Sequence, residues 1–251
     1  MDLKQKIIDS FNSGARTYDG AADIQQLTAK RLACDVAQLK TKNILEIGCG
    51  TGLFSQYLQR LFPEAHLLLT DIAPAMTAVC QGRLSRFDNV DVMCIDGEAL
   101  TLPRKFDLIA SNMTFHWFCH FKKSISKLLS KLTPQGHFIF SLLGENSLPE
   151  WKEICASLGV TTLTPIFPAL SEIKESFPEF ELRTQKISLK YDSAHAFLRT
   201  LKLLGATTPG KKHQQLSTRQ LREIMTSFDK KPPSKRKITY EIIYGRYMKN
   251  D

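Results

Sequence analysis

The sequence predicts an α/β fold with a doubly wound, mostly parallel sheet, and three observations support this prediction. Short apolar runs alternate with longer stretches that carry apolar residues at helical spacing. A glycine-rich loop follows the first apolar run, at the point where a strand is expected to turn into a helix. The length of 251 residues is enough for one large domain with a substantial core.

The order of the segments supports each expected element. Each apolar run is an expected strand, and the stretch that separates it from the next run has the spacing of a helix. Such alternation of strands and helices produces parallel strands with helices on both faces of the sheet. Strands are expected at 43–48, 66–71, 90–95, 106–111, 136–142, 182–191 and 238–247. Helices are expected at 53–61, 74–84, 121–132, 148–158, 170–177, 194–204 and 218–228.

Composition excludes several classes of protein. Hydrophobic residues make up 43% and charged residues 24%, as in ordinary globular proteins, which argues against a disordered or collagen-like chain. No apolar run approaches the roughly 18 residues of a membrane-spanning helix. For this reason we expect no membrane partner. The six cysteines form no C-x-x-C pair, so we expect a reduced, cytoplasmic protein with no metal site.

The positive charge is concentrated near the C-terminus. Residues 183–251 contain 16 Lys and Arg against 5 Asp and Glu, a net charge of +11, whereas residues 1–182 sum to −2. Such asymmetry indicates an acidic partner, either a nucleic acid or an acidic protein. A solvated basic surface without any partner is the open alternative.

Polar and glycine residues follow the expected strands at the edge where a doubly wound sheet binds its ligand. The loop Glu46-Ile47-Gly48-Cys49-Gly50-Thr51-Gly52 has the spacing G-x-G-x-G, not the G-x-G-x-x-G of dinucleotide-binding proteins. Asp71 ends the second strand, where a carboxylate can accept hydrogen bonds from both hydroxyls of a ribose. The alternative is that Asp71 is the N-cap of the helix that follows. Asp96-Gly97-Glu98 and Ser111-Asn112 follow the third and fourth strands, although an isolated Asp-Gly can be a simple turn.

This glycine loop resembles motif I of the class I S-adenosylmethionine-dependent methyltransferases. The resemblance implies a Rossmann-like fold with S-adenosyl-L-methionine as the cofactor and S-adenosyl-L-homocysteine as the product. It also places Asp96 against the adenine amino group and the cofactor at the mouth formed by the fourth strand. The implied cofactor-binding residues are Glu46, Gly48, Cys49, Gly50, Gly52, Asp71, Ile72, Met76, Asp96, Gly97, Glu98, Ser111 and Asn112.

Motifs along almost the whole chain resemble the malonyl-carrier-protein O-methyltransferases of early biotin synthesis. They include Phe11, Tyr18-Asp19, Gln25 or Gln26, His116-Trp117, Ser147-Leu148-Pro149-Glu150, Leu201-Lys202, Leu204-Gly205-Ala206-Thr207 and Thr239-Tyr240-Glu241. The resemblance implies methyl esterification of the malonyl carboxylate on an acidic acyl carrier protein, by a monomer. The chain departs from the family at His116, where the family usually has Gln, and at Pro134-Gln135-Gly136, where it has a Pro-Gly-Gly turn.

The resemblance also divides the chain into three parts of one methyltransferase domain, 1–251. Residues 1–40 are expected to form N-terminal lid helices, residues 41–145 the S-adenosylmethionine-binding core, and residues 146–251 the substrate-side helices and last strands, with helical insertions. Seven strands in total are expected in the sheet.

The chemistry of this reaction needs few catalytic groups. A malonyl carboxylate is ionised at neutral pH, so its methylation requires no general base, only orientation, a cation and exclusion of water. Arg199 and Lys202 are the candidate cations, with an exposed basic helix face as the alternative. Tyr18 is expected in the lid, and Trp117, Phe115 and His116 are expected beside the substrate, although core packing accounts equally for the aromatic rings.

The basic C-terminal region fits the acidic carrier protein. Candidate rim residues are Lys122, Lys123, Lys211, Lys212, Arg219 and Arg222. Three alternatives stay open: a methyltransferase acting on another small carboxylic acid, as in aconitate-type enzymes, an RNA methyltransferase, and a scaffold that binds the carrier protein without methylating it. The sequence argues against nucleic acid, because it contains no N-P-P-Y motif, no Pro-Cys dipeptide and no recognisable RNA-binding module.

Overall fold

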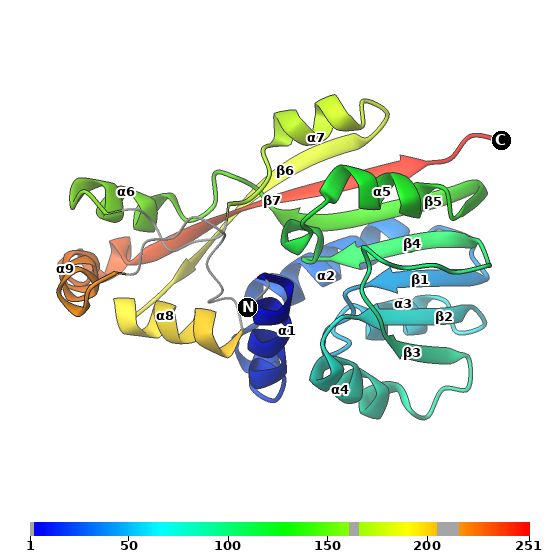
Figure 1. Cartoon of the computed structure of the whole chain (residues 1–251), viewed down its shortest axis with the longest axis horizontal. Helices are drawn as coiled ribbons and strands as arrows, with labels where there is room; N and C mark the ends of the chain where they lie inside the picture. Colours follow the sequence, from blue (N-terminus) through cyan, green and yellow to red (C-terminus); the bar gives the residue numbers. More distant parts are fainter. Residues whose placement is uncertain (1–2, 161–165, 205–215) are drawn as a thin grey trace.

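The computed structural model describes residues 3–160, 166–204 and 216–251, and its main feature is one twisted sheet (Figure 1). Seven strands are present in these ranges, in the order β3-β2-β1-β4-β5-β7-β6. Strands β1 to β5 are parallel, whereas β7 runs antiparallel to both β5 and β6. The strands are β1 (Asn43–Ile47), β2 (His66–Asp71), β3 (Val90–Cys94), β4 (Phe106–Asn112), β5 (Leu132–Leu143), β6 (Glu181–Lys190) and β7 (Lys237–Met248).

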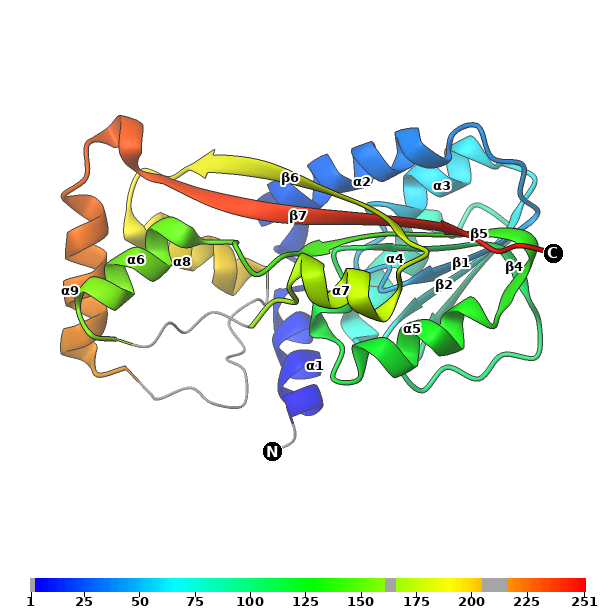
Figure 2. The same ribbon diagram turned by 90° about the horizontal axis from the view of Figure 1, so that it is seen from above.

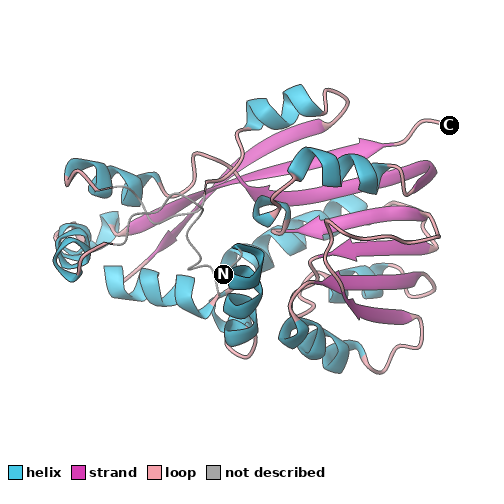
Figure 3. Cartoon of the chain, in the orientation of Figure 1, coloured by secondary structure: helices cyan, strands magenta, loops and turns pink. Residues whose placement is uncertain are grey.

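Helices cover both faces of the parallel part of the sheet (Figure 3). Figure 2 shows α2 and α3 along one face and α5 and α7 along the other. Strands enclosed in this way bury consecutive apolar residues, as in β2, where Leu67, Leu68 and Leu69 are all buried. The helices are α2 (Asp23–Val36), α3 (Ser55–Leu61), α4 (Pro74–Leu84), α5 (Phe121–Leu129) and α7 (Leu170–Ser176).

The two faces of the sheet hold separate apolar cores. One core joins α2, α3 and α4 to β1 and β2 and continues to Trp151, Phe197 and Phe228 in the C-terminal part of the chain. The other lies under α5 and α7 and is built largely from the rings of Phe106, Phe138 and other phenylalanines.

The antiparallel strands β6 and β7 extend beyond the rest of the sheet and carry a second group of helices (Figures 1 and 2). These helices are α6 (Pro149–Ser157), α8 (Ala194–Leu203) and α9 (Thr218–Asp229). Helix α9 contacts both α6 and α8, and α6 contacts β7. The C-terminal part of the chain therefore forms a helical wall beside the carboxyl edge of the sheet.

The N-terminal segment lies between these two parts of the molecule (Figure 1). It consists of α1 (Leu3–Gly14) and the 3-10 helix η1 (Tyr18–Ala21). Helix α1 contacts α4, and η1 contacts α8. We call residues 3–22 the cap; α2, in contrast, buries Ile24, Leu32 and other side chains in the core against the sheet.

The predicted doubly wound, mostly parallel seven-stranded sheet is confirmed, and the expected strands and helices occur within a few residues of their expected bounds. The largest difference is β5, which begins at Leu132 instead of 136, because Leu132 already pairs with Phe106 across a bulge. Gln135 accommodates that bulge with a φ of 58°. No helix in the described ranges is both long and apolar enough to cross a membrane.

Candidate functional site

The glycine loop between β1 and α3 requires glycine for two different reasons. Gly48 has a φ of 71°, and a Cβ there would lie 2.1 Å from the Thr114 hydroxyl oxygen, so no side chain fits. Gly50 also has a positive φ, of 54°, but a Cβ there would meet nothing within 4 Å. The loop is therefore packed tightly against Thr114 at one point and open to the cavity at another.

Two buried carboxyl groups lie behind this loop. Asp71 at the end of β2 accepts backbone N–H groups from Gly50 and Ala73, each at 2.9 Å. Glu46 in β1 accepts the hydroxyl of Ser55 at 2.6 Å and is 1% exposed. Burial raises the pKa of Glu46 to about 8 and also raises that of Asp71, since water no longer stabilises their charges. Such a site favours a positively charged ligand, whose charge would offset the cost of ionising Glu46.

A second acidic pair follows β3. The Lys4 ammonium from α1 lies 2.6 Å from Asp96 and 2.8 Å from Glu98, so the cap is attached to this pair. Although burial favours the neutral amine, the hydrogen bonds with Asp96 and Glu98 raise the pKa of Lys4. The same contacts lower the pKa of Glu98 despite its partial burial, and Glu98 also accepts the backbone N–H of His120 at 2.7 Å.

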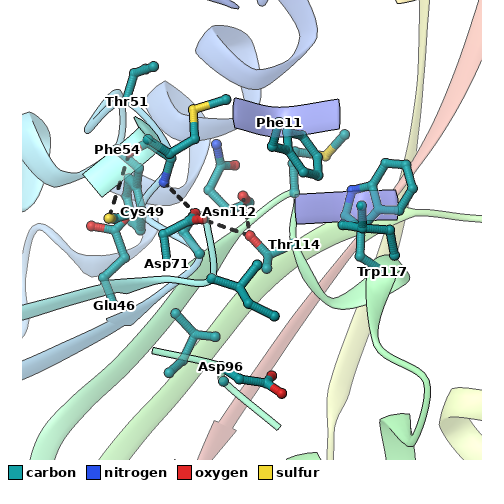
Figure 4. Close-up of a pocket in the computed structure, with 18 of the residues that line it drawn as sticks. Phe11, Glu46, Cys49, Thr51, Phe54, Asp71, Asp96, Asn112, Thr114 and Trp117 are labelled. Carbon is teal, nitrogen blue, oxygen red and sulfur yellow. Dashed lines mark hydrogen bonds between the residues drawn. The ribbon is translucent and has the colours of Figure 1, made fainter. Parts of the chain in front are cut away.

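These groups surround one cavity, which we call the loop cavity. Figure 4 shows Glu46 and Cys49 on one side of it and Phe11 and Trp117 on the other. The rings of Phe11 and Trp117 meet edge to face, with their centroids 5.4 Å apart. Further lining residues include Lys4, Tyr18, Gln25, Gly48, Gly50, Asp71, Ile72, Met76, Asp96, Gly97, Glu98, Asn112, Met113 and Thr114.

A second, mainly apolar cavity of about 290 Å³ lies between the sheet and the C-terminal helices. We call it the helix cavity, because α6, α8 and α9 contribute to its wall. Tyr191 and Tyr240 belong to its lining, and their hydroxyls are hydrogen-bonded at 2.9 Å. Other lining residues include His116, Leu143, Leu148, Trp151, Phe167, Leu198, Leu201, Lys202, Leu216 and Leu221.

The two cavities share one wall. The residues that line both are Phe11, Tyr18, Gln25, Met113 and Trp117. Three of them come from the cap and the start of α2, and two come from the segment that follows β4. Because the carboxamide oxygen of Gln25 is buried without a hydrogen-bond partner among the described residues, this wall also offers a free acceptor.

His116 lies in the helix cavity as a neutral ring. Its Nδ1 accepts the backbone N–H of Leu143 at 3.4 Å, and the rings of Trp117 and Phe167 contact it. Burial lowers the pKa of His116 to about 3, so at neutral pH the ring carries one proton. We assign that proton to Nε2, because Nδ1 acts as an acceptor, and His116 is then an uncharged hydrogen-bond donor.

Most of the predicted cofactor-binding residues line the loop cavity, but two do not. The exceptions are Gly52, which faces Cys80, and Ser111, which is fully buried and donates its hydroxyl to the Ile47 carbonyl at 2.8 Å. Asn112 does line the cavity: its side-chain oxygen accepts the hydroxyl of Ser141, and its side-chain N–H donates to the backbone carbonyl of Gln25. Within the described residues, no group of three or more His, Cys, Asp or Glu side chains is placed to hold a metal ion.

The predicted substrate residues are divided between the two cavities. Tyr18 and Trp117 line both cavities, His116 and Lys202 line the helix cavity, and Arg199 lines neither. Phe115 is 1% exposed and packs on Phe138 and Phe140, so core packing accounts for it.

The predicted rim residues are not brought together. Lys122 and Lys123 belong to α5, far from Arg219 and Arg222 on α9 (Figures 1 and 2). Lys211, Lys212 and the motif 205–207 lie outside the described residues.

Sequence reasoning missed Lys4 and Thr114, which line the loop cavity but belong to no recognisable ligand-binding pattern. It named Asp19 only as part of the motif Tyr18-Asp19, without a role, although Asp19 contacts Thr51 of the glycine loop. The motifs at Ser147-Leu148-Pro149-Glu150 and Thr239-Tyr240-Glu241 were recognised in the sequence, but without a role for their residues. In the structure these two motifs bind each other: Glu150 accepts from Thr239, and the Ser147 hydroxyl bonds to the Glu241 backbone. They hold Leu148 and Tyr240 in the wall of the helix cavity.

The chain is similar to known methyltransferases. A family model described as a methyltransferase domain matches residues 44–136. The solved structure of the N-methyltransferase NodS from Bradyrhizobium japonicum in complex with S-adenosyl-L-homocysteine has a TM-score of 0.57 at 14% identity, over 98% of this chain and 100% of that chain. This likeness confirms the class I methyltransferase fold that the glycine loop predicted.

Sequence relatives are more specific. A protein of Bordetella avium named biotin biosynthesis bifunctional protein BioCD is 32% identical over 249 residues, and this chain spans 52% of its length. The malonyl-[acyl-carrier protein] O-methyltransferase of Magnetococcus marinus is 31% identical over 243 residues, which is 94% of this chain and 90% of that protein. With this coverage, the chain belongs to the family of malonyl-[acyl-carrier protein] O-methyltransferases.

Proposed function

We propose that this protein transfers the methyl group of S-adenosylmethionine to the free carboxylate of malonyl-acyl carrier protein, giving the methyl ester used early in biotin synthesis. The observation that carries the proposal is the wall that Phe11, Tyr18, Gln25, Met113 and Trp117 form between the loop cavity and the helix cavity. A methyl donor in the first cavity and an acceptor in the second would meet at this wall.

The residues that line the loop cavity fit S-adenosylmethionine. The open space at Gly50 allows a ligand to contact the backbone, and the buried Glu46 and Asp71 favour a cationic ligand. Asp71 would hold the ribose hydroxyls, and Asp96 would hold the adenine amino group beside Gly97. When bound, S-adenosylmethionine supplies an electrophilic methyl group on a sulfonium.

The helix cavity fits an ionised acyl carboxylate that needs orientation rather than deprotonation. We assign orientation of that carboxylate to the Nε2–H of His116, because this donor is neutral and its ring is held by Leu143, Trp117 and Phe167. Lys202 on the rim would supply a positive charge. The apolar lining excludes water, and the tyrosine and tryptophan of the shared wall cover the reacting atoms.

We propose that the acidic carrier protein docks beside α8 and α9. These helices contact each other, and a surface groove beside α9 is lined by Arg219, Arg222 and Lys230, the last directly after the helix. Glu223 also lines the groove and pairs with Arg219, which leaves a net positive charge. Leu221 of α9 lines the helix cavity, so the basic surface lies next to the expected entrance for the acyl group. Positive charge here would attract the carrier protein and increase the rate of its capture.

Intact-protein mass spectrometry tests the reaction directly. Malonyl-acyl carrier protein is incubated with this protein and S-adenosylmethionine, with succinyl-carrier protein and malonyl-coenzyme A in parallel. We expect one added methyl group, removable by mild ester hydrolysis and strongest on the malonyl carrier. No mass change in spite of cofactor binding would exclude this substrate and favour another small carboxylic acid.

A pair of charge reversals tests the docking surface. Arg222→Glu should lower kcat/KM for malonyl-carrier protein about tenfold at low salt, while turnover of malonyl-coenzyme A changes less than about twofold. Lys123→Glu on α5 is the matched control, because it makes the same charge change far from the helix cavity. Equal losses with both variants would overturn the proposed docking site.

A further inference from the structure

Asp19 of the cap joins three segments around the loop cavity. One carboxylate oxygen accepts the hydroxyl of Thr51 in the glycine loop at 2.5 Å, and the other accepts from the guanidinium of Arg83 in α4. The backbone carbonyl of Asp19 also accepts from the Gln26 side chain at 3.0 Å, which fixes it to α2. A single residue therefore connects η1 with the glycine loop, α4 and α2.

Arg83 is held against the same loop independently of Asp19. A Cβ on Gly52 would lie 3.6 Å from Cδ of Arg83, so the stem of the arginine runs along the glycine loop. Nη1 of Arg83 is buried without a hydrogen-bond partner among the described residues. Asp19 is thus the carboxylate that neutralises a guanidinium fixed beside the loop, and its loss would leave that charge without its ion-pair partner.

The contacts of Asp19 determine the position of Tyr18. Tyr18 directly precedes Asp19 and lies in the wall between the two cavities. Apolar contacts also hold Tyr18 in place, because it packs in a cluster with Leu53, which follows the glycine loop, and Leu204, which follows α8. Asp19 itself lines neither of these two cavities, so it acts on them through Tyr18 and Thr51.

We propose that Asp19 is a positioning residue that clamps the cap onto the glycine loop and holds Tyr18 over the bound cofactor. The proposal rests on the cofactor site proposed above. Thr51 lines the loop cavity and also donates its hydroxyl to Asp19. Closure of the cap and binding of the cofactor in the loop cavity therefore favour each other. Without the clamp, the closed state is less populated and the apparent affinity for the cofactor falls in proportion.

The test measures binding and cap closure separately from catalysis. S-adenosyl-L-homocysteine is titrated calorimetrically into the wild type, Asp19→Ala and Asp19→Glu, and tryptic cleavage after the exposed Arg16 is followed with and without this ligand. We expect Asp19→Ala to bind about tenfold more weakly. The ligand should protect Arg16 in the wild type and not in Asp19→Ala, and Asp19→Glu should restore part of both effects.

Arg83→Gln and the double variant extend the test. If the two residues act as one clamp, the double variant should bind no more weakly than the weaker single variant. In a methyl-transfer assay, Asp19→Ala should raise the KM for S-adenosylmethionine and also lower kcat, because Tyr18 is no longer fixed at the shared wall. A general loss of structure would instead lower the melting temperature and the active fraction without changing KM.

Asp35→Asn is the matched control. Asp35 also pairs with an arginine, Arg183, and the pair joins α2 to β6 away from the loop and helix cavities. This variant should keep wild-type affinity and wild-type protection of Arg16. Equal binding and protection in the wild type and Asp19→Ala would overturn the Asp19 proposal alone, whereas no binding by the wild type would overturn the cofactor site on which it rests.

Discussion

The two cavities are built in opposite ways. The loop cavity takes most of its polar groups from the ends of four neighbouring strands, within residues 46–118, and fixes them with backbone hydrogen bonds. The helix cavity is mainly apolar and draws its wall from residues spread between 11 and 240. Local sequence therefore specifies the first cavity, whereas the second exists only after distant segments have packed.

The wall of the helix cavity contains strained backbone. Met113 and Leu148 have φ angles of 57° and 63°, which are unfavourable for residues with a side chain. Both line the helix cavity, and each is held by hydrogen bonds from its backbone N–H, Met113 to Ser141 and Leu148 to the Thr239 carbonyl. Such strain persists where the surrounding structure enforces it, which is common in binding sites.

The largest expected effect is at the locally specified cavity. Gly48→Ala would place a Cβ 2.1 Å from the Thr114 hydroxyl, in a backbone conformation that alanine rarely adopts. Affinity for S-adenosyl-L-homocysteine should fall by about 100-fold or more, equal to about 2.7 kcal/mol. Calorimetric titration measures this loss.

Gly82→Ala is the control for Gly48→Ala. Gly82 lies in α4, where a Cβ would meet nothing within 4 Å. Alanine there should keep the affinity and stabilise the helix by about 0.5–1 kcal/mol. Tight binding by the Gly48→Ala variant would contradict the steric account of the loop.

The contrast between the cavities explains how much the sequence revealed. Gly48, Asp71 and Asp96 each follow an apolar strand, and parallel strands bring their carboxyl ends to one edge, so pattern alone located the loop cavity. Arg199 and Lys202 illustrate the limit, because both lie on α8 and only packing decides that Lys202 lines the helix cavity. Asp19 and Lys4 act through contacts with residues 32 and 92 positions away, and no periodicity predicts those contacts.

The second prediction concerns the helix cavity. His116→Phe keeps an aromatic ring but removes the N–H donor, so kcat/KM for the malonyl substrate should fall about 30-fold. Affinity for S-adenosyl-L-homocysteine should change less than about twofold, because His116 does not line the loop cavity. Steady-state kinetics and calorimetry on the same preparations separate the two effects.

His116→Gln is the matching variant, since an amide also supplies a neutral N–H donor. It should keep activity within about threefold of the wild type. If glutamine lost as much activity as phenylalanine, the role assigned to a neutral donor would be wrong.

A smaller effect is expected at the rim of the helix cavity. Lys202→Met should raise the KM for the malonyl substrate about fivefold, as expected for one partly solvated charge. Arg199→Met, on the same helix but outside the lining, should change it less than about twofold. The reverse order would show that Arg199 holds the substrate carboxylate.

The last prediction concerns the pH dependence of stability, which has opposite signs in the two cavities. Glu46 keeps its proton in the folded protein up to about pH 8 but loses it near 4.5 when unfolded. Between these values the folded state binds more protons, so Glu46 makes stability fall as pH rises. His116 has a folded pKa of about 3 against 6.5 unfolded, so it makes stability rise with pH across that interval.

Urea unfolding between pH 5 and 8.5 separates the two contributions. The His116 contribution levels off as pH rises above 6.5, and between about pH 7 and 8 the fall in wild-type stability should be reduced in Glu46→Gln by up to about 1.4 kcal/mol per pH unit. His116→Gln should change the slope mainly below about pH 7. A slope above pH 6.5 that is the same in the wild type and Glu46→Gln would mean that Glu46 is ionised in the folded protein, and that the loop cavity already compensates its charge before any cationic ligand binds.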